Sequence, residues 1–144
     1  MGGENLFSIE SWLPFLLAKN HQFTFGLMKK AVEPFGLTPP QFATLAFLWA
    51  GDGVNQQELG TKMHVDRTTI GGIIERLEKL GYVQRDESPE DGRSYKLFVT
   101  PQGREIQEPV LSQLQEVQNH LDMSLSRDEQ DQLLVLLQKL RNAK

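Results

Sequence analysis

Apolar residues recur at helical spacing along most of the chain and alternate as in strands in only one short region. Residues 8–35 carry apolar side chains on more than one helix face, with Pro14 near the start and Gly36 just past the end. Proline is tolerated in a first turn, and glycine often follows a last turn. The pattern predicts a first helix over 8–35, entered through Ser11, whose burial on several sides calls for a partner subunit.

Three motifs of the capping-box type predict further helix starts. In each, a polar residue and a Gln or Glu three positions later satisfy each other's backbone N–H groups. The motifs begin at Thr38, Asn55 and Ser126. The first predicts a buried scaffold helix that stops at Gly51, the second a short helix with Leu59 pointing inward, and the third an amphipathic last helix.

Residues 66–80 have the features of a helix that faces something outside the protein. Asp66 is placed to cap it, and five apolar positions follow helical spacing on the inner side. The outer side carries mostly short or basic residues, namely Arg67, Thr68, Thr69, Gly71, Gly72, Glu75, Arg76 and Lys79. Threonine and glycine are poor helix formers, so stability alone does not explain them. Short side chains at the positive end of the helix dipole suit a DNA groove lined by phosphates, whereas the alternative is close packing of the glycines against another helix.

Two alternating runs, residues 82–85 and 95–99, flank a turn-rich segment and predict a β-hairpin. The short helix from Asn55, the turn at His64 and Val65 and the helix over 66–80 have the arrangement of a helix-turn-helix, and a hairpin directly after one is a wing. Arg93 near its tip is placed to enter a minor groove, and Asp91 two residues earlier is placed to brace its guanidinium. The alternative is a solvated loop with an incidental arginine.

The C-terminal third predicts further helices with apolar seams. Residues Ile106, Val110, Leu114, Val117 and Leu121 are spaced close to a heptad repeat, and Pro109 is expected to bend or break the helix early. Together with the apolar first helix, these seams predict a dimer in which both chain ends interlock. The alternative is that each leucine stripe belongs to an intramolecular core.

Composition narrows the class of protein. The 144 residues, 39% hydrophobic and 24% charged, fit one globular domain. No apolar run is long enough to span a membrane, the start is not a secretory signal, and the absence of cysteine excludes disulfides. A cytoplasmic location is therefore expected. The net charge of −4, with seven Lys/Arg against eight Asp/Glu within 55–99, makes indiscriminate nucleic-acid binding unfavourable, so any DNA binding must depend on how the charges are arranged.

Catalytic chemistry is not evident in the sequence. No nucleophile stands next to a candidate base, and the three histidines share no ligand spacing. We expect no enzyme activity, no catalytic residues, no cofactor and no metal site.

The run from Glu58 to Gly103 resembles the winged helix-turn-helix of the MarR family of transcriptional regulators. The resemblance rests on Leu59, the segment 65–69, Leu77 before Gly81, the Asp91-x-Arg93 pair and Val99-Thr100-x-x-Gly103. It implies a mainly α fold with a small β-hairpin wing, in which residues 1–144 form one domain. Within it, 1–36 and 101–144 would be dimerisation helices and 37–100 the DNA-binding lobe.

The resemblance also implies which residues act. The expected DNA contacts come from Arg67, Thr68, Thr69, Gly72, Arg76, Arg93 and Lys96, with Asp91 supporting the wing. Gly71 and Gly72 depart from the family pattern, in which larger residues are common there, so base contacts should rest mainly on Arg67 to Thr69, Arg76 and the wing. Family members bind small aromatic or anionic effectors between the first helix and the lobe, and the corresponding candidates are Trp12, Phe15, His21, Phe25 and Trp49.

The leading hypothesis is a homodimeric regulator, a repressor relieved by a small ligand, that binds a palindromic duplex and has no membrane partner. Two alternatives remain. The first is a winged-helix protein-interaction module without a DNA role, which the acidic net charge favours. The second is a metal-responsive regulator, which would need His64 or His120 to converge with carboxylates.

Overall fold

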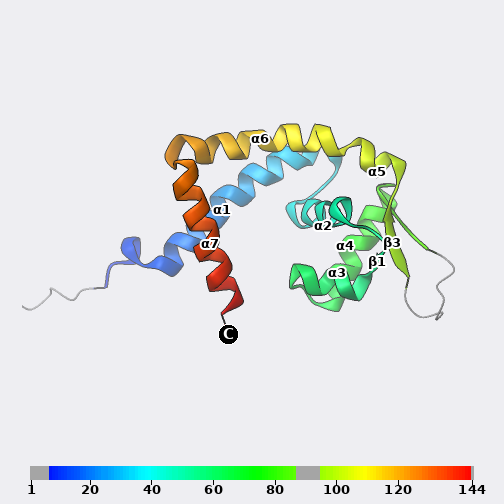
Figure 1. Cartoon of the computed structure of the whole chain (residues 1–144), viewed down its shortest axis with the longest axis horizontal. Coiled ribbons are helices and arrows are strands. Elements are labelled where there is room, and N and C mark those ends of the chain that lie inside the picture. The colour runs from blue at the N-terminus through cyan, green and yellow to red at the C-terminus, as the bar shows by residue number, and fades with distance from the viewer. Residues whose placement is uncertain (1–6, 87–94, 144) are drawn as a thin grey trace, which may run out of the picture.

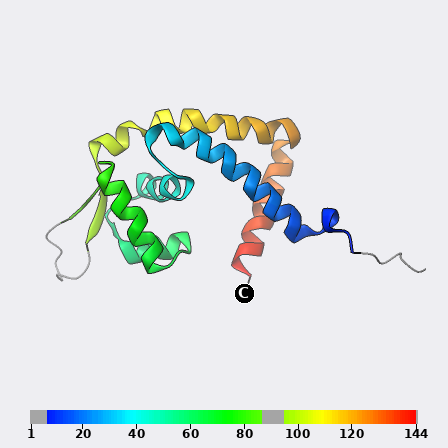
Figure 2. The ribbon, with the colours of Figure 1, turned by 180° about the vertical axis from the view of Figure 1, so that it is seen from behind.

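The computed structural model describes residues 7–86 and 95–143, and most of them are helical. The elements in chain order are η1 (Ile9–Ser11), α1 (Leu13–Val32), η2 (Glu33–Phe35), α2 (Pro39–Ala50), β1 (Val54–Asn55), α3 (Gln56–Met63), α4 (Arg67–Lys79), β2 (Val83–Arg85), β3 (Lys96–Val99), α5 (Pro101–Glu105), α6 (Gln107–Ser124) and α7 (Arg127–Asn142). Figure 1 shows α6 along one edge of the molecule with α1 beside it, while α2, α3, α4 and the sheet form a lobe next to α5. Figure 2 shows the same arrangement from behind. The predicted fold class is confirmed.

The first helix is shorter than the range 8–35 that its apolar pattern predicted. It begins at Leu13 and ends at Val32, and 3₁₀ turns stand on both sides of it. Ser11 was wrongly predicted as its start. The residue before the helix is Trp12, which forms no side-chain cap, so α1 begins without the local hydrogen bond found at the starts of α2, α3, α4 and α7.

All three predicted capping boxes are present, and each satisfies two backbone N–H groups at a helix start. The pairs are Thr38 with Gln41 before α2, Asn55 with Glu58 before α3, and Ser126 with Glu129 before α7. These four-residue interactions place the helix starts where the sequence predicted them.

The core of the lobe lies between α2, α3, α4 and the sheet. Its fully buried side chains include Leu45, Leu48, Leu59, Ile70, Ile74, Leu77 and Leu97. Helices α3 and α4 approach closely at Gly60, where a Cβ atom would lie 3.3 Å from Cγ2 of Ile70. This close crossing sets the angle at which α4 presents its outer face.

The sheet has three antiparallel strands in the order β1-β3-β2, rather than the two strands that the alternating runs predicted. Strand β2 pairs Val83 with Val99, as the hairpin requires. Strand β1 adds a pair between Val54 and Leu97 on the other side of β3. Only two residues long, β1 is too short to show alternation, and for that reason the sequence did not reveal it.

The C-terminal helical region is divided near Pro109, as predicted. Helix α5 ends at Glu105 and α6 begins at Gln107, so Pro109 lies in the first turn of α6. A proline ring excludes the carbonyl four residues earlier, here that of Glu105, and this accounts for the position of the break.

Polar contacts join α5 to the lobe. Nε1 of Trp49 donates to the carbonyl oxygen of Gly103 at 3.0 Å, and Oγ1 of Thr100 donates to that of Gly81 at 2.6 Å. Asp52 Oδ2 accepts from the backbone N of Val99 and from Arg104, each at 3.0 Å. The joint fixes the lobe relative to the start of α5.

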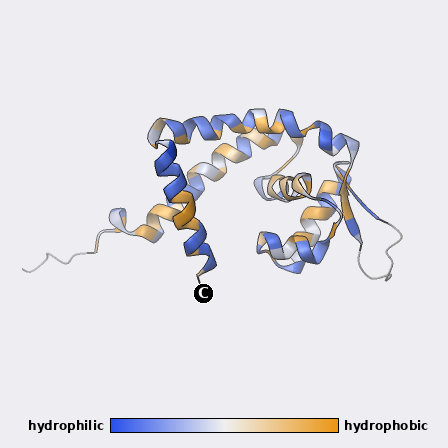
Figure 3. Cartoon of the chain, in the orientation of Figure 1, coloured by the Kyte–Doolittle hydropathy of each residue, from blue (hydrophilic) through white to orange (hydrophobic). Residues whose placement is uncertain are grey.

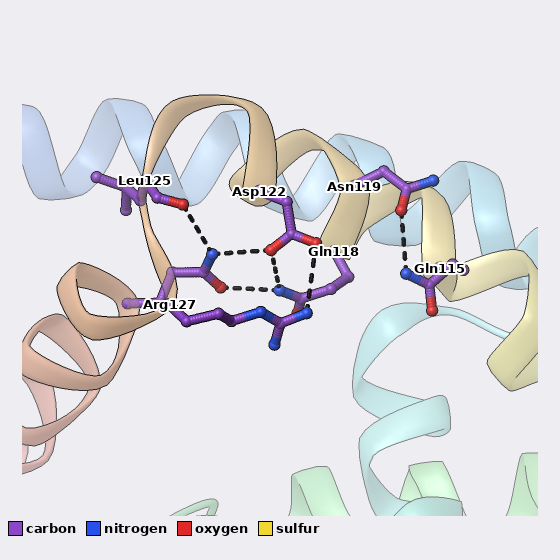
Figure 4. Close-up of polar contacts among 7 residues, drawn as sticks. Gln115, Gln118, Asn119, Asp122, Leu125 and Arg127 are labelled. Carbon is purple, nitrogen blue, oxygen red and sulfur yellow. Dashed lines mark hydrogen bonds and ion pairs between the residues drawn. The ribbon is translucent and has the colours of Figure 1, made fainter.

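Helix α7 leaves α6 at a corner, shown in Figure 4. There Asp122 Oδ1 accepts from Nε2 of Gln118 and Nε2 of Gln130, each at 2.9 Å, and Arg127 lies 3.4 Å from Oδ2. These donors, Gln130 first and then Gln118, hold the pKa of Asp122 below its ordinary value. Beyond the corner, no residue of α7 is buried.

The outer helices expose large apolar side chains. Examples on α7 are Val135 and Leu136, each 61% exposed, and Leu13 on α1 has the same exposed fraction. Figure 3 shows a hydrophobic stretch midway along the otherwise hydrophilic α7. Within the described residues, no helix combines the length and the hydrophobicity that crossing a membrane requires.

Candidate nucleic-acid interface

The candidate interface centres on α4, whose two sides differ as the sequence predicted. Ile70, Ile73, Ile74 and Leu77 are buried on the inner side. The outer residues Arg67, Thr68, Thr69, Gly72 and Arg76 are all exposed. A buried stripe opposite an exposed polar face anchors the helix to the lobe and leaves its outer face open to solvent.

The start of α4 is held by Asp66. Its Oδ1 accepts a hydrogen bond from the backbone N of Thr69 at 2.7 Å, and the preceding His64 adopts the left-handed conformation at φ 57°. The hydrogen bonds from Thr69 hold the pKa of the Asp66 carboxyl below its ordinary value. The turn and the cap together fix the direction in which the first residues of α4 project.

The basic residues of the outer face differ in their partners. Lys79 forms an exposed ion pair with Glu75, with Nζ 3.6 Å from Oε1. Within ranges 7–86 and 95–143, neither Arg67 nor Arg76 forms an ion pair or a side-chain hydrogen bond. These two guanidinium groups therefore keep all their donors for an outside partner, and arginine is suited to phosphate and to guanine edges.

A hollow of about 500 Å³ lies beside the start of α4, between α3 and the sheet. Arg67 and Ile70 line it from α4, and Arg85 and Tyr95 from the wing side. The pattern along the sequence did not identify Arg85 as part of this site. The feature of the sequence that could have identified Arg85 is the opposite charge of Glu78 before the turn at Gly81. In the structure Arg85 Nε lies 2.9 Å from Glu78 Oε1.

The wing is described only in part. Lys96 is exposed at the first position of β3, next to Asn55 of β1. The predicted contact residue Arg93 and its predicted support Asp91 lie outside the described residues. Their roles remain predictions.

The two glycines on α4 have different surroundings. A Cβ atom on Gly72 would meet nothing within 4 Å, whereas a Cβ on Gly71 would lie 3.2 Å from Nε2 of Gln56. The neighbour of Gly71 is therefore a side-chain amide of α3 rather than the backbone of a packed helix.

The candidate effector residues are spread over the molecule. His21 and Phe25 are neighbours on α1, with ring centroids 5.5 Å apart, and Trp12 lies at the start of the same helix. Trp49 lies at the joint with α5, where its ring contacts Phe42 instead. Among the described residues, no ring contact joins Trp12 or Trp49 to the α1 candidates, and a common effector site stays a prediction.

Side chains that ligate metals do not gather in the part of the chain that the structure describes, where no group of three or more His, Cys, Asp or Glu lies together. His120 instead stacks on Phe23, with ring centroids 4.5 Å apart. This contact holds α6 against α1.

Known proteins similar to this chain include transcriptional regulators of the helix-turn-helix type. The sequence model of the MarR family matches residues 37–95. The HTH-type transcriptional regulator SarZ of Staphylococcus saprophyticus is 27% identical over 94% of this chain and 89% of its own length. The uncharacterized HTH-type regulator YkoM of Bacillus subtilis is 31% identical over 72% of this chain and 68% of its own.

A solved structure resembles the whole fold. The transcriptional repressor CouR, bound to a 23-mer DNA duplex, is 30% identical to this chain and superposes with a TM-score of 0.87. The match covers 93% of this chain and 95% of that one. The similarity therefore extends beyond the lobe to the outer helices.

Proposed function

This chain belongs to the MarR family, and on that premise we propose that it is a sequence-specific regulator of transcription that binds double-stranded DNA. One observation carries the proposal: α4 is capped and anchored on one side, and its other side offers Arg67 and Arg76 without partners among the described residues. The DNA-bound state of CouR, the 30% identical protein, supports the same function.

The proposed contacts are those expected from the sequence. Arg67, Thr68, Thr69 and Arg76 would face the major groove, and Gly72 would let the groove wall approach the helix. Lys96 would contact the backbone, and Arg93, braced by Asp91, would enter the minor groove. Phosphate contacts position a protein on DNA, and base contacts give it specificity.

We propose that the functional unit is a homodimer. Support comes from α7, which has no buried residue, and from Leu13 and Trp12 at the start of α1, which are 61% and 48% exposed. Pairing of these surfaces would remove apolar area from water. Two lobes separated by about one helical turn of DNA, roughly 34 Å, would then bind a palindromic operator.

The proposal includes a role as a repressor that a small aromatic or anionic effector releases from DNA. Trp12, Phe15, His21, Phe25 and Trp49 remain the candidate contacts. Relief requires that the effector bind the DNA-free arrangement more tightly than the DNA-bound one. Titration of a protein–operator complex with a panel of aromatic carboxylates tests this part, which is abandoned if none changes the affinity for DNA.

Selection of binding sites from a random duplex pool tests the main proposal. The expected product is an inverted repeat whose affinity falls steeply with salt, because neutralised phosphates release counterions. We expect Arg67→Ala to change the sequence preference and Arg93→Ala to weaken binding to every sequence. Lys29→Ala removes an exposed charge from α1 and serves as the control. Weak binding to every duplex, indifferent to salt, would contradict the proposal.

A protein-interaction module is the second candidate, favoured by the net charge of −4. It predicts a pure protein that carries no nucleic acid and shifts no duplex at low salt. A metal-responsive regulator predicts that zinc or a chelator changes the affinity for DNA.

The relatives named above are transcriptional regulators, and we propose that this chain likewise has no catalytic activity and acts in the cytoplasm.

A further inference from the structure

The space beside Gly71 on α4 is occupied by a side chain from another helix. Gln56 is the first residue of α3, and its Nε2 lies 3.2 Å from where a Cβ on Gly71 would stand. A separation this short is tighter than ordinary van der Waals contact. The amide therefore takes the place next to α4 that a side chain at position 71 would otherwise fill.

The position of this amide is determined by its neighbours. The capping box of Asn55 and Glu58 fixes the start of α3, because Asn55 Oδ1 accepts from the backbone N of Glu58 at 2.8 Å. Gln56 follows directly, and its side chain also lines the hollow that contains Arg67. It is half-buried, so part of its rotational freedom is already lost before any ligand binds.

The amide also has hydrogen-bonding capacity that no described residue uses. Within the described parts of the chain, the Gln56 side chain forms no hydrogen bond, although the amide offers two donors and an acceptor. Other polar side chains at helix starts, such as Thr38 and Asn55, are engaged in caps. As far as the described residues go, Gln56 is thus a hydrogen-bonding group without a partner, on the flank of the helix that carries Thr68 and Arg67.

We infer that Gln56 is a specificity-determining residue of the DNA-binding surface, supplying from α3 the base contact that Gly71 cannot supply from α4. The inference rests on the proposed function. A glutamine amide pairs with N6 and N7 of adenine in the major groove, so the contact selects adenine at one position of each half-site. Gly71 has a role in this arrangement, because a larger residue there would displace the amide.

The first experiment compares the sites selected by the wild-type protein and by Gln56→Ala. We expect the variant to lose about 5- to 100-fold of discrimination at one adenine position, the range for a bidentate base contact, with an unchanged salt dependence. Gln56→Glu should change the preference at this position from adenine to cytosine, because a carboxylate only accepts hydrogen bonds and cytosine offers its N4 amino group as a donor. Gln113→Ala, which removes the same amide from an exposed position of α6, is the matched control.

A second experiment uses the glycine. Gly71→Ala should lower the same adenine preference in the wild-type background, because its methyl group displaces the amide. In the Gln56→Ala background it should change nothing further. An effect of Gly71→Ala that persists without the amide would mean that the methyl group itself disturbs DNA, and would overturn the inference.

The selected sites distinguish a failure of this inference from a failure of the proposed function. A wild-type protein that selects no sequence contradicts both. A wild-type protein that selects an operator, together with a Gln56→Ala variant of identical preference at every position, contradicts only the role of Gln56. Circular dichroism of each variant confirms that the comparison is made between folded proteins.

Discussion

Nε of Arg85 lies 2.9 Å from Oε1 of Glu78, and this ion pair joins the first strand of the wing to the last turn of α4. Both side chains are about one-third exposed, at 36% and 31%. The pair bridges the turn at Gly81 and holds the two parts of the proposed DNA-binding surface together.

The first prediction concerns the strength of this pair. In a double-mutant cycle with Glu78→Gln and Arg85→Gln, we expect a coupling free energy of at most about 1 kcal/mol, because partial exposure screens the charges. The pair of Glu75 and Lys79, which is 64% and 68% exposed, should give a smaller value. Thermal unfolding of the four proteins in each cycle provides the measurement, and equal coupling in both pairs would contradict the expectation.

The second prediction concerns Gly103 in α5. A Cβ atom there would collide with the backbone carbonyl oxygen of Tyr82, and a backbone atom cannot move away as a flexible side chain can. We expect Gly103→Ala to destabilise the fold by about 3 kcal/mol, the upper end for overpacking. Gly26→Ala is the control, since a Cβ on Gly26 meets nothing within 4 Å and should stabilise α1 by up to about 1 kcal/mol. Chemical denaturation distinguishes the two, and similar midpoints would refute this account of Gly103.

The third prediction is a pH dependence at the start of α4. The hydrogen bonds from Thr69 lower the pKa of Asp66 in the folded state, so the unfolded state takes up the proton first as the pH falls. The contribution of Asp66 to stability is therefore present above the ordinary aspartate pKa of about 4 and is lost as the pH falls through the lower, folded-state pKa. The difference in unfolding free energy between wild type and Asp66→Asn should shrink over that range. A difference that stays constant down to the acid limit would show that the charge of Asp66 contributes nothing.

The fourth prediction concerns the corner between α6 and α7. Asp122 accepts hydrogen bonds from Gln118 and Gln130, and Asp122→Ala should release α7 from its fixed direction and weaken the proposed dimer. Gln115→Ala is the matched control, because the hydrogen bond that Gln115 donates to Asn119 stays within α6, as Figure 4 shows. Sedimentation over a range of concentrations measures the dimer dissociation constant. If the two variants dissociate alike, the corner does not determine how the chains pair.

The parts of the fold that could be predicted from the sequence are those determined by neighbouring residues. A capping box needs four consecutive positions, so the starts of α2, α3 and α7 were visible in the sequence. The start of α1 has no such interaction. The helix begins after Trp12, which forms no side-chain cap, and not at the predicted Ser11. Strand β1 depends on pairing with Leu97, more than forty positions away, and nothing in its two residues indicates that pairing.

In the candidate site, too, the features set by neighbouring residues could be predicted from the sequence, and those set by distant residues could not. The exposure of Arg67 and Arg76 follows from the spacing of apolar residues on their own helix, so the sequence predicted it. The contact between Gln56 and Gly71 depends on the distance and angle at which α3 crosses α4, and only the three-dimensional structure reveals it. The surroundings of Gly71 could not be predicted from the sequence, because the group that lies beside it comes from another helix.

The absence of a capping interaction at α1 has a consequence for the order of folding. Helices that begin with a capping box form partly through local contacts, which close quickly because the intervening chain is short. Helix α1 instead packs mainly against α6, where Phe23 meets His120, and that contact closes a loop of nearly one hundred residues. We therefore expect α1 to dock last during folding and to open first in the native protein, with amide hydrogens that exchange earlier than those of α2 and α4.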